Sequence, residues 1–177
     1  MKIAMISYSG SGKSTLARFL GKCYQVPVLH LDCVHWLPGW KEREGKEEQV
    51  LVEQFMDAND SWVIDGNYTK LSYQRRMKEA DRIIFLNFNR FTCLYRAWKR
   101  LMRYQGEARE SMTEGCTEKL DLEFIWWILY KGRTRKYRKR YQAVRKQYPE
   151  KVTVIRSQRQ LDAFMARICH LLAMSRS

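Results

Sequence analysis

The sequence is poor in proline and has no long apolar run. Three prolines occur in 177 residues, and 45% of the residues are hydrophobic. This composition argues against extensive disorder and predicts one globular domain spanning 1–177. The longest apolar run, Phe124–Tyr130, is much shorter than the ~20 residues that a membrane-spanning helix needs, and it suits a buried helix face. We therefore expect no membrane association.

Closely spaced cysteine pairs are also missing. The five cysteines are widely and irregularly spaced, and no C-x-x-C occurs. This spacing argues against a disulfide framework and against a structural zinc site. Reduced thiols indicate a cytoplasmic protein. The N-terminal residues run into a glycine-rich loop without a cleavage-type segment, so we expect no signal peptide.

Acidic residues are few, and the charge is unevenly placed. The chain has 33 Lys and Arg against 19 Asp and Glu, a net charge of +14. Residues 1–80 carry 11 against 10, whereas residues 81–177 carry 22 against 9. The second half should therefore attract an anion. Nucleotide phosphates, nucleic acid and acidic membrane surfaces all qualify, and charge alone does not choose among them.

Short apolar runs alternate with segments of helical spacing. The runs that read as buried strands are Lys2–Ile6, Pro27–Leu31, Trp62–Ile64, Arg82–Leu86 and Val152–Ile155. We expect the second of these to end at Asp32 and a helix over Glu42–Met56. Such alternation predicts an α/β fold with a parallel sheet covered on both faces. The region from about 90 to 148 departs from it, and we interpret it as a basic helical insertion with a mobile segment around Gly106 and Gly115.

The stretch SYSGSGKST (7–15) nearly matches the phosphate-binding pattern G-x-x-x-x-G-K-[ST]. Gly12, Lys13 and Ser14 fit, whereas Ser7 stands where the pattern has glycine. A strand before the loop and a helix after it are both expected here, as the motif requires. A glycine-serine turn that only caps a helix is the alternative. It does not explain a lysine at a helix N-terminus, where the macrodipole disfavours a cation unless an anion is bound.

In a loop of this kind, backbone N–H groups surround phosphate oxygens at a helix N-terminus. Lys13 would reach the β- and γ-phosphates of ATP, and the Ser14 hydroxyl would bind Mg²⁺. The residues that we expect to bind the nucleotide are Ser9, Gly10, Ser11, Gly12, Lys13, Ser14 and Thr15.

Two aspartates follow expected strands. In open α/β sheets, ligands bind beyond the carboxyl ends of the strands, so Asp32 and Asp65 should converge on the loop. We assign Asp65 to the Mg²⁺ site together with Ser14, and Asp32 to positioning or deprotonating an acceptor hydroxyl. The alternative is that either aspartate only caps a following helix.

Four stretches together are distinctive: SYSGSGKST (7–15), LDCVHWLPGW (31–40), WVIDGNY (62–68) and EGCTEKLDLEF (114–124). They resemble the adenylate-kinase-like P-loop proteins of the DNA topology modulation (FlaR-like) family, over nearly the whole chain. The resemblance implies a nucleoside-kinase-like P-loop NTPase fold with a five-stranded parallel sheet, ATP binding, and a helical lid that carries arginines. The chain departs from the family's pattern at Ser7 and at Asn87 and Asn89.

Kinases need cations around the transferred phosphoryl group. By resemblance, lid arginines should come from the groups that contain Arg96, Arg100 and Arg133, although each could be a solvated surface charge. Arg75 and Arg76 could meet the acceptor. The aromatic side chains Trp36, Trp40 and Tyr68 could stack on a base or sugar, or pack in the core, whereas Trp126 and Trp127 are expected in the core.

The segment 131–146 holds nine Lys and Arg. It could contact nucleic acid phosphates or be a solvated helix. Our first hypothesis is an ATP-binding, Mg²⁺-dependent phosphotransferase acting on a small molecule. The second is a nucleotide-controlled DNA-binding or DNA-topology regulatory protein. A catalytically inert interaction protein is a third option. The sequence does not indicate an oligomeric state.

Overall fold

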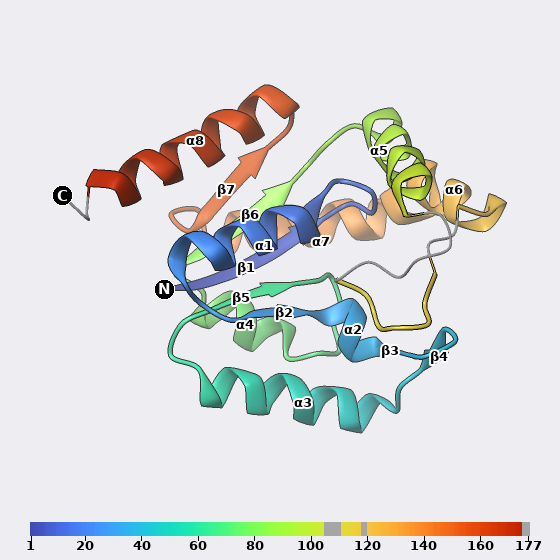
Figure 1. The fold of residues 1–177 in the computed structure, drawn as a ribbon, viewed down its shortest axis with the longest axis horizontal. Coiled ribbons are helices and arrows are strands. Elements are labelled where there is room, and N and C mark those ends of the chain that lie inside the picture. Colours follow the sequence, from blue (N-terminus) through green and yellow to red (C-terminus); the bar gives the residue numbers. More distant parts are fainter. Residues whose placement is uncertain (105–110, 118–119, 175–177) are drawn as a thin grey trace.

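A five-stranded parallel sheet lies at the centre of the protein (Figure 1). The computed structural model describes residues 1–104, 111–117 and 120–174. The strands of the sheet run in the order β2–β5–β1–β6–β7, and every pairing within it is parallel. Their bounds are β1 (Lys2–Ser7), β2 (Val28–His30), β5 (Trp62–Asp65), β6 (Arg82–Leu86) and β7 (Val152–Ile155). All five predicted strands are therefore confirmed, together with the α/β fold class.

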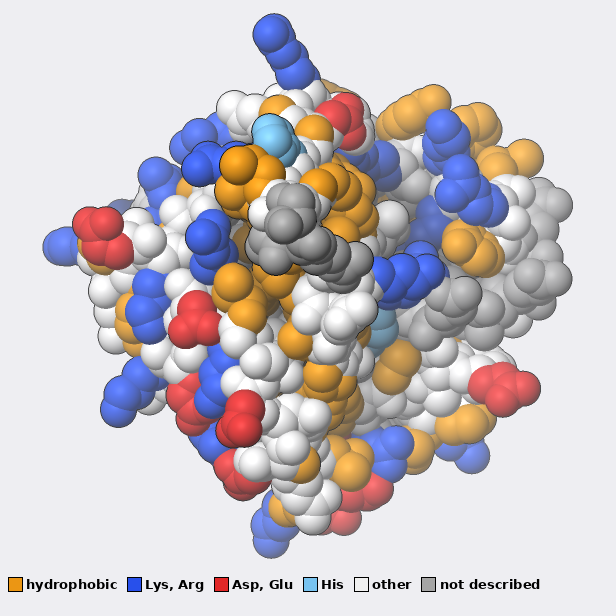
Figure 2. All heavy atoms as spheres, turned by 60° about the vertical axis from the view of Figure 1, so that its left-hand side comes forward, with side chains coloured by type: hydrophobic (Ala, Val, Ile, Leu, Met, Phe, Trp, Pro, Cys, Tyr) orange, Lys and Arg blue, Asp and Glu red, His pale blue; other side chains and the backbone are white. Residues whose placement is uncertain are grey.

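Helices cover both faces of this sheet, with α1 in front of it and α7 behind it in the view of Figure 1. The helices are α1 (Lys13–Tyr24), α2 (Leu31–His35), α3 (Gly45–Ala58), α4 (Tyr73–Glu79), α5 (Arg90–Arg103), α6 (Leu122–Leu129), α7 (Arg135–Gln147) and α8 (Gln158–Met174), with a 3₁₀ turn η1 at Lys131–Arg133. Among the described residues, no helix combines the length and the hydropathy needed to cross a bilayer. Lys and Arg side chains are spread over the face shown in Figure 2.

The core is built around β1, the middle strand of the sheet. Ile3, Ala4, Met5 and Ile6 are each no more than 1% exposed, because helices pack on both faces of this strand. Strands buried on both sides read as continuous apolar runs rather than as alternating ones, which is why the opening run was recognisable. The buried β1 carries the chain directly to the loop at its carboxyl end.

The second strand is shorter than predicted. It ends at His30, and Leu31–His35 forms α2, so Asp32 lies in the first turn of a helix rather than at the end of a strand. A carboxylate in the first turn is favoured by the helix dipole. A short antiparallel hairpin follows, β3 (Trp36–Leu37) with β4 (Lys41–Glu42), and α3 begins only at Gly45.

The insertion is helical, as predicted, but its apolar run is not a buried face. On α6 only Ile128 is fully buried, and Trp126 is 58% exposed. The prediction that Trp126 belongs to the core is wrong, because α6 packs on α5 with one side and presents the other to solvent. Gly106 lies outside the described residues, and Gly115 lies beside Pro38 of the hairpin.

Candidate active site

The loop between β1 and α1 has the backbone that an anion site requires. Gly10 and Gly12 have φ angles of 78° and 89°, in the left-handed region that favours glycine. Within the described ranges, the amides of Gly10, Gly12, Lys13 and Ser14 have no hydrogen-bond acceptor on the protein. The first turn of α1 therefore leaves its N–H groups available to a bound anion.

Ser7 belongs to the strand and not to the curved part of the loop. It pairs in register with Leu86 of β6, and its φ angle is not left-handed. The Asn67 side chain accepts from the Ser7 amide at 3.0 Å and donates to the Ser7 carbonyl oxygen at 2.5 Å, while the Tyr141 hydroxyl donates to the same oxygen at 2.8 Å. A side chain is compatible with this extended backbone, so the departure from the glycine pattern leaves the loop geometry intact.

Lys13, Asp65 and His30 form a buried chain of contacts at the carboxyl end of the sheet. The Lys13 ammonium donates to Oδ1 of Asp65, and the His30 ring lies with Nδ1 2.8 Å from Oδ2 of the same carboxylate. The Asp65 side chain is 1% exposed. Burial alone would raise the pKa of Asp65, but the charge of Lys13 and the hydrogen bond from His30 outweigh it and hold that pKa well below its ordinary value.

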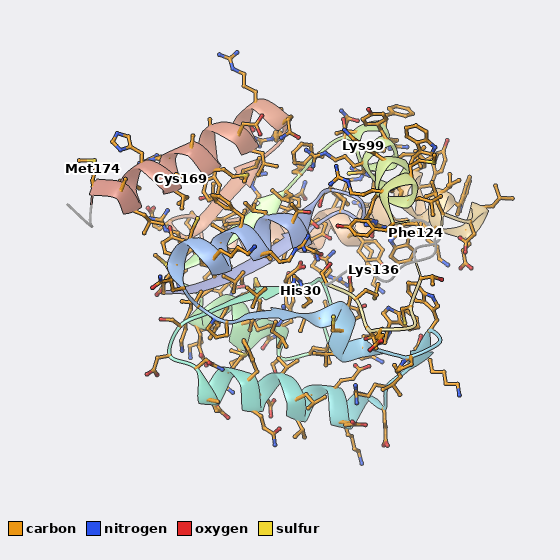
Figure 3. All side chains as sticks on the ribbon, in the orientation of Figure 1. His30, Lys99, Phe124, Lys136, Cys169 and Met174 are labelled. Carbon is orange, nitrogen blue, oxygen red and sulfur yellow. The ribbon has the colours of Figure 1, made fainter. Side chains whose placement is uncertain are left out.

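His30 is a site residue that the sequence analysis missed. It is the last residue of β2 and pairs in register with Asp65 on the neighbouring strand, which places the two side chains together. Figure 3 shows it near the centre of the molecule, between α1 and α2. The sequence did indicate that His30 belongs to the second strand, since the apolar run of that strand continues through position 30.

Asp32 lies on the α2 side of the site. The Tyr68 hydroxyl, from the loop after β5, donates to its Oδ1 at 2.9 Å. Burial and the neighbouring carboxylate raise the pKa of Tyr68, so this phenol stays protonated and keeps donating. Asp32 thus comes from α2 and Asp65 from the end of β5, and their convergence on a bound ligand stays a prediction.

Aromatic rings gather beside Asp32. The His35 ring lies 4.6 Å from Trp36 and 4.7 Å from Tyr68, and Trp36 lies 5.4 Å from Trp40, all between ring centroids. His35 also contacts the buried Glu48 carboxylate at 2.7 Å. The three predicted aromatic residues therefore belong to one cluster, and each of them is partly exposed.

Arg96 and Arg133 contact the loop and its flanks. Arg96 donates to the Ser11 carbonyl oxygen and lies with its guanidinium carbon 3.9 Å from the Phe88 ring centroid. Arg133 donates to the Phe88 carbonyl oxygen at 2.9 Å and lies 4.0 Å from the Tyr8 ring centroid. Both side chains thus hold positive charge around the loop.

The insertion reaches the site from its α6 side. The Trp127 indole N–H donates to the Ser9 hydroxyl at 3.2 Å, a contact between residues 118 positions apart that the sequence did not suggest. Trp127 is only partly buried. Arg100 is half-buried on α5, one turn beyond Arg96, as the predicted spacing implied.

Two of the distinctive sequence blocks meet in space. The Thr113 hydroxyl donates to the Trp36 carbonyl oxygen at 2.5 Å, and the Cys116 thiol lies 3.3 Å from the Leu37 carbonyl oxygen. Cys116 is 1% exposed. The segment 111–117 therefore packs on the β3–β4 hairpin.

Arg75 and Arg76 do not point to an acceptor. Arg75 forms ion pairs with Asp57 and Glu79 at the surface. Arg76 is fully buried and donates to the carbonyl oxygens of three loop residues, Gly66, Tyr68 and Leu71. Burial lowers the pKa of Arg76 to about 10. Its hydrogen bonds hold the loop that carries Tyr68, so its part in the site is indirect.

Comparison with known proteins supports the fold. No family model and no curated protein matches the chain. Solved structures do match over nearly its whole length. A shikimate kinase from Bacteroides thetaiotaomicron is 17% identical with a TM-score of 0.52, and 98% of each chain is covered. A deoxyadenosine kinase from M. mycoides with bound dATP is 15% identical with a TM-score of 0.50, covering 95% of this chain and 98% of the other.

A third solved structure, an uncharacterized protein from Eubacterium ventriosum, is 14% identical with a TM-score of 0.53, and 98% of each chain is covered. Identities this low establish the fold and nothing finer. The chain shares its α/β fold with these solved structures.

Proposed function

We propose that this protein is an ATP- and Mg²⁺-dependent phosphotransferase that phosphorylates a hydroxyl group of a small molecule. The observation that carries the proposal is the buried contact chain of Lys13, Asp65 and His30 at the N-terminus of α1, where the amides of Gly10, Gly12, Lys13 and Ser14 have no acceptor among the described residues. Phosphoryl transfer depends mainly on positioning and charge neutralisation, and this arrangement supplies both.

The side chains present fit a magnesium nucleotide. The residues from Ser9 to Thr15 would hold the phosphates, with Lys13 turning from Asp65 to the β- and γ-phosphates. The Ser14 hydroxyl and the Asp65 carboxylate are oxygen ligands of the kind that Mg²⁺ takes. A bound Mg²⁺ would neutralise charge that develops on the phosphate oxygens. His30 would keep Asp65 ionised and oriented after Lys13 has moved.

Asp32 would act on the acceptor. The acceptor hydroxyl would donate to its carboxylate, and the hydroxyl oxygen would then form a bond to the γ-phosphorus as the bond to the β-phosphate oxygen breaks. The proton goes to Asp32, and ADP leaves. Arg96, Arg100 and Arg133 would stabilise the charge on the transferred group.

Membership of the DNA topology modulation family is part of this proposal. Two of the motif blocks on which the resemblance depends pack on each other, through Cys116 and Leu37. Such long-range contact is expected if the two blocks serve one site. A cytoplasmic location fits both an ATP-consuming enzyme and five free cysteines.

Replacing Asp32 by asparagine should reduce kcat by about 10²–10⁴-fold, because the asparagine amide does not take up the acceptor's proton. The KM for ATP should stay unchanged, since Asp32 belongs to α2 and not to the phosphate-binding loop. Steady-state kinetics on the wild type, Asp32→Asn and the exposed control Asp60→Asn measure this. Wild-type kcat in Asp32→Asn would remove this residue from the mechanism.

A nucleotide-controlled DNA-binding protein is the second candidate, and the exposure of basic side chains in the segment 131–146 favours it. Seven of the nine cations in the segment 131–146 are exposed: Lys131, Arg135, Lys136, Arg138, Lys139, Arg145 and Lys146. Phosphate contacts by these side chains would weaken steeply with salt and would not depend on base sequence.

A gel-shift titration with duplex DNA, with and without ATP, tests this candidate. Binding at low salt should fall on Lys136→Ala/Lys139→Ala and be unaffected by the control Lys46→Ala on α3. If no complex forms even at low salt, the DNA-binding candidate is rejected.

A further inference from the structure

The acceptor side of the site is acidic in a strongly basic protein. Residues 31–58, which form α2, the β3–β4 hairpin and α3, hold three Lys and Arg against seven Asp and Glu, a net charge of −4 (3 − 7). The whole chain is +14. In Figure 2 the acidic side chains lie mostly in the lower half, toward α3. This segment therefore lowers the electrostatic potential where an acceptor would enter.

Among the residues that the structure describes, three arginines on this side already have protein partners. Arg43 donates to the Val34 carbonyl oxygen at 2.8 Å and to Glu47 at 2.5 Å. Arg75 is paired with two carboxylates, and Arg76 is buried among backbone carbonyl oxygens, as described above. A phosphate or carboxylate on an acceptor is best held by a bidentate arginine. Arg43 and Arg76 could bind such a group only by breaking contacts that order the hairpin or the Tyr68 loop, and Arg75 is already paired with carboxylates of α3 and α4.

The lysines of the segment do not replace them. Lys41 and Lys46 are exposed, in β4 and at the start of α3. Pairs between exposed charges contribute little in water. An anionic acceptor would instead lie beside Asp32, whose like charge disfavours it.

What this side does offer suits a cation or a neutral alcohol. Asp32 accepts a hydroxyl proton, and the partly exposed rings of His35, Trp36, Trp40 and Tyr68 cluster beside it. Aromatic faces attract positively charged groups and stack on sugars and bases. Negative charge and aromatic rings together therefore recognise an ammonium group.

We propose that the phosphoryl acceptor is an alcohol without a phosphate or carboxylate group, and that a positively charged amino alcohol or amino sugar is preferred. This inference rests on the proposed phosphotransferase function and names its substrate class. It excludes nucleoside monophosphates, although the fold is shared with nucleoside kinases.

A charge-matched acceptor screen tests the proposal. ADP formation is measured with saturating Mg-ATP and sets of related compounds: glucosamine, glucose and glucose 6-phosphate; ethanolamine, ethylene glycol and glycolate; adenosine and AMP. The panel is extended to further amino alcohols and amino sugars with their phosphorylated or carboxylated analogues. We expect turnover only with non-anionic compounds, with kcat/KM at least tenfold higher for the aminated member of a set.

Two results overturn the proposal: faster turnover of a monophosphate or an acid than of its uncharged analogue, and no turnover of any non-anionic alcohol in the extended panel. Calorimetry with Mg-ATP separates these results from failure of the proposed function. If Mg-ATP binds to the wild type but not to Lys13→Ala, and AMP is phosphorylated, the proposed acceptor class is refuted. The proposed phosphotransferase function is then still supported. No binding of Mg-ATP would refute the kinase itself.

A second measurement tests whether exposed carboxylates near the hairpin contribute to the binding of a cationic acceptor. Glu42 and Glu44 are exposed beside the hairpin, and neither is assigned to the catalytic machinery. In Glu42→Gln/Glu44→Gln, the KM for a cationic acceptor should rise about two- to fivefold, with the KM for ATP unchanged. The matched control is Glu150→Gln, an exposed carboxylate in the turn before β7. An unchanged KM for the cationic acceptor, or an equal rise for its neutral analogue, would count against the electrostatic preference.

Discussion

Replacing Lys13 by alanine should lower turnover by about 10²–10³-fold, because it removes the cation that neutralises the β- and γ-phosphates. The structure adds a second effect. Lys13 is the ion-pair partner of the buried Asp65, and leaving a buried charge without its partner costs about 3–5 kcal/mol of unfolding free energy. Loss of activity in this variant could therefore reflect partial unfolding, so turnover and urea unfolding must be measured together.

The double variant Lys13→Ala/Asp65→Asn tests the stability effect, because Asp65 is itself assigned to Mg²⁺ and its loss also lowers turnover. It removes the buried charge, so most of the lost stability should return while turnover stays low. Lys22→Ala is the matched control, since Lys22 is an exposed lysine near the end of the same helix. A stable double variant with wild-type turnover would rule out this lysine as a catalytic group.

Replacing Gly10 by alanine should destabilise the protein by about 3–5 kcal/mol, since two costs add together. Gly10 has a φ angle of 78°, which an alanine adopts with strain. In addition, a Cβ atom at this position would lie 2.4 Å from the Cys93 carbonyl oxygen of α5, so the loop or the helix must shift. Denaturant unfolding measures the loss, and calorimetry should show weaker binding of Mg-ATP.

Gly39 provides a close control for this substitution. Its φ angle is 76°, and a Cβ atom there would have no neighbour within 4 Å. Gly39→Ala should therefore cost only the backbone strain, about 1–2 kcal/mol. The difference between the two variants isolates the contact of the loop with α5. Equal losses would show that α5 does not constrain the loop.

The sheet was predictable because its strands are buried on both faces and appear as short apolar runs between turn residues. The loop and Asp65 were predictable for a related reason. Both follow directly from strand ends, and the carboxyl edge of a parallel sheet is where ligands bind. Ser9 through Thr15 form the expected loop and the first turn of α1, and their roles as ligand-binding residues stay predictions.

Contacts between distant segments were not predictable from one sequence. The indole of Trp127 reaches Ser9 only because α6 packs on α5, and neither local periodicity nor composition specifies that packing. The exposure of Trp126 was not predictable for the same reason. An apolar run indicates how hydrophobic a helix is, but not how many of its sides pack against other elements. Arg76 looked like a surface or ligand-binding cation because no sequence pattern marks an arginine that satisfies backbone carbonyl oxygens.

The extended backbone at Ser7 also affects how such loops are recognised in other sequences. In this chain the first position of the pattern is the last residue of a strand. At such a position, any small residue is compatible with the loop if neighbouring residues form hydrogen bonds with its amide and carbonyl groups. A search that insists on glycine at that position tests for a conformation that this chain does not use. Searches that allow serine or alanine there, but keep the glycine before the lysine, should recover proteins whose loops curve in the same way.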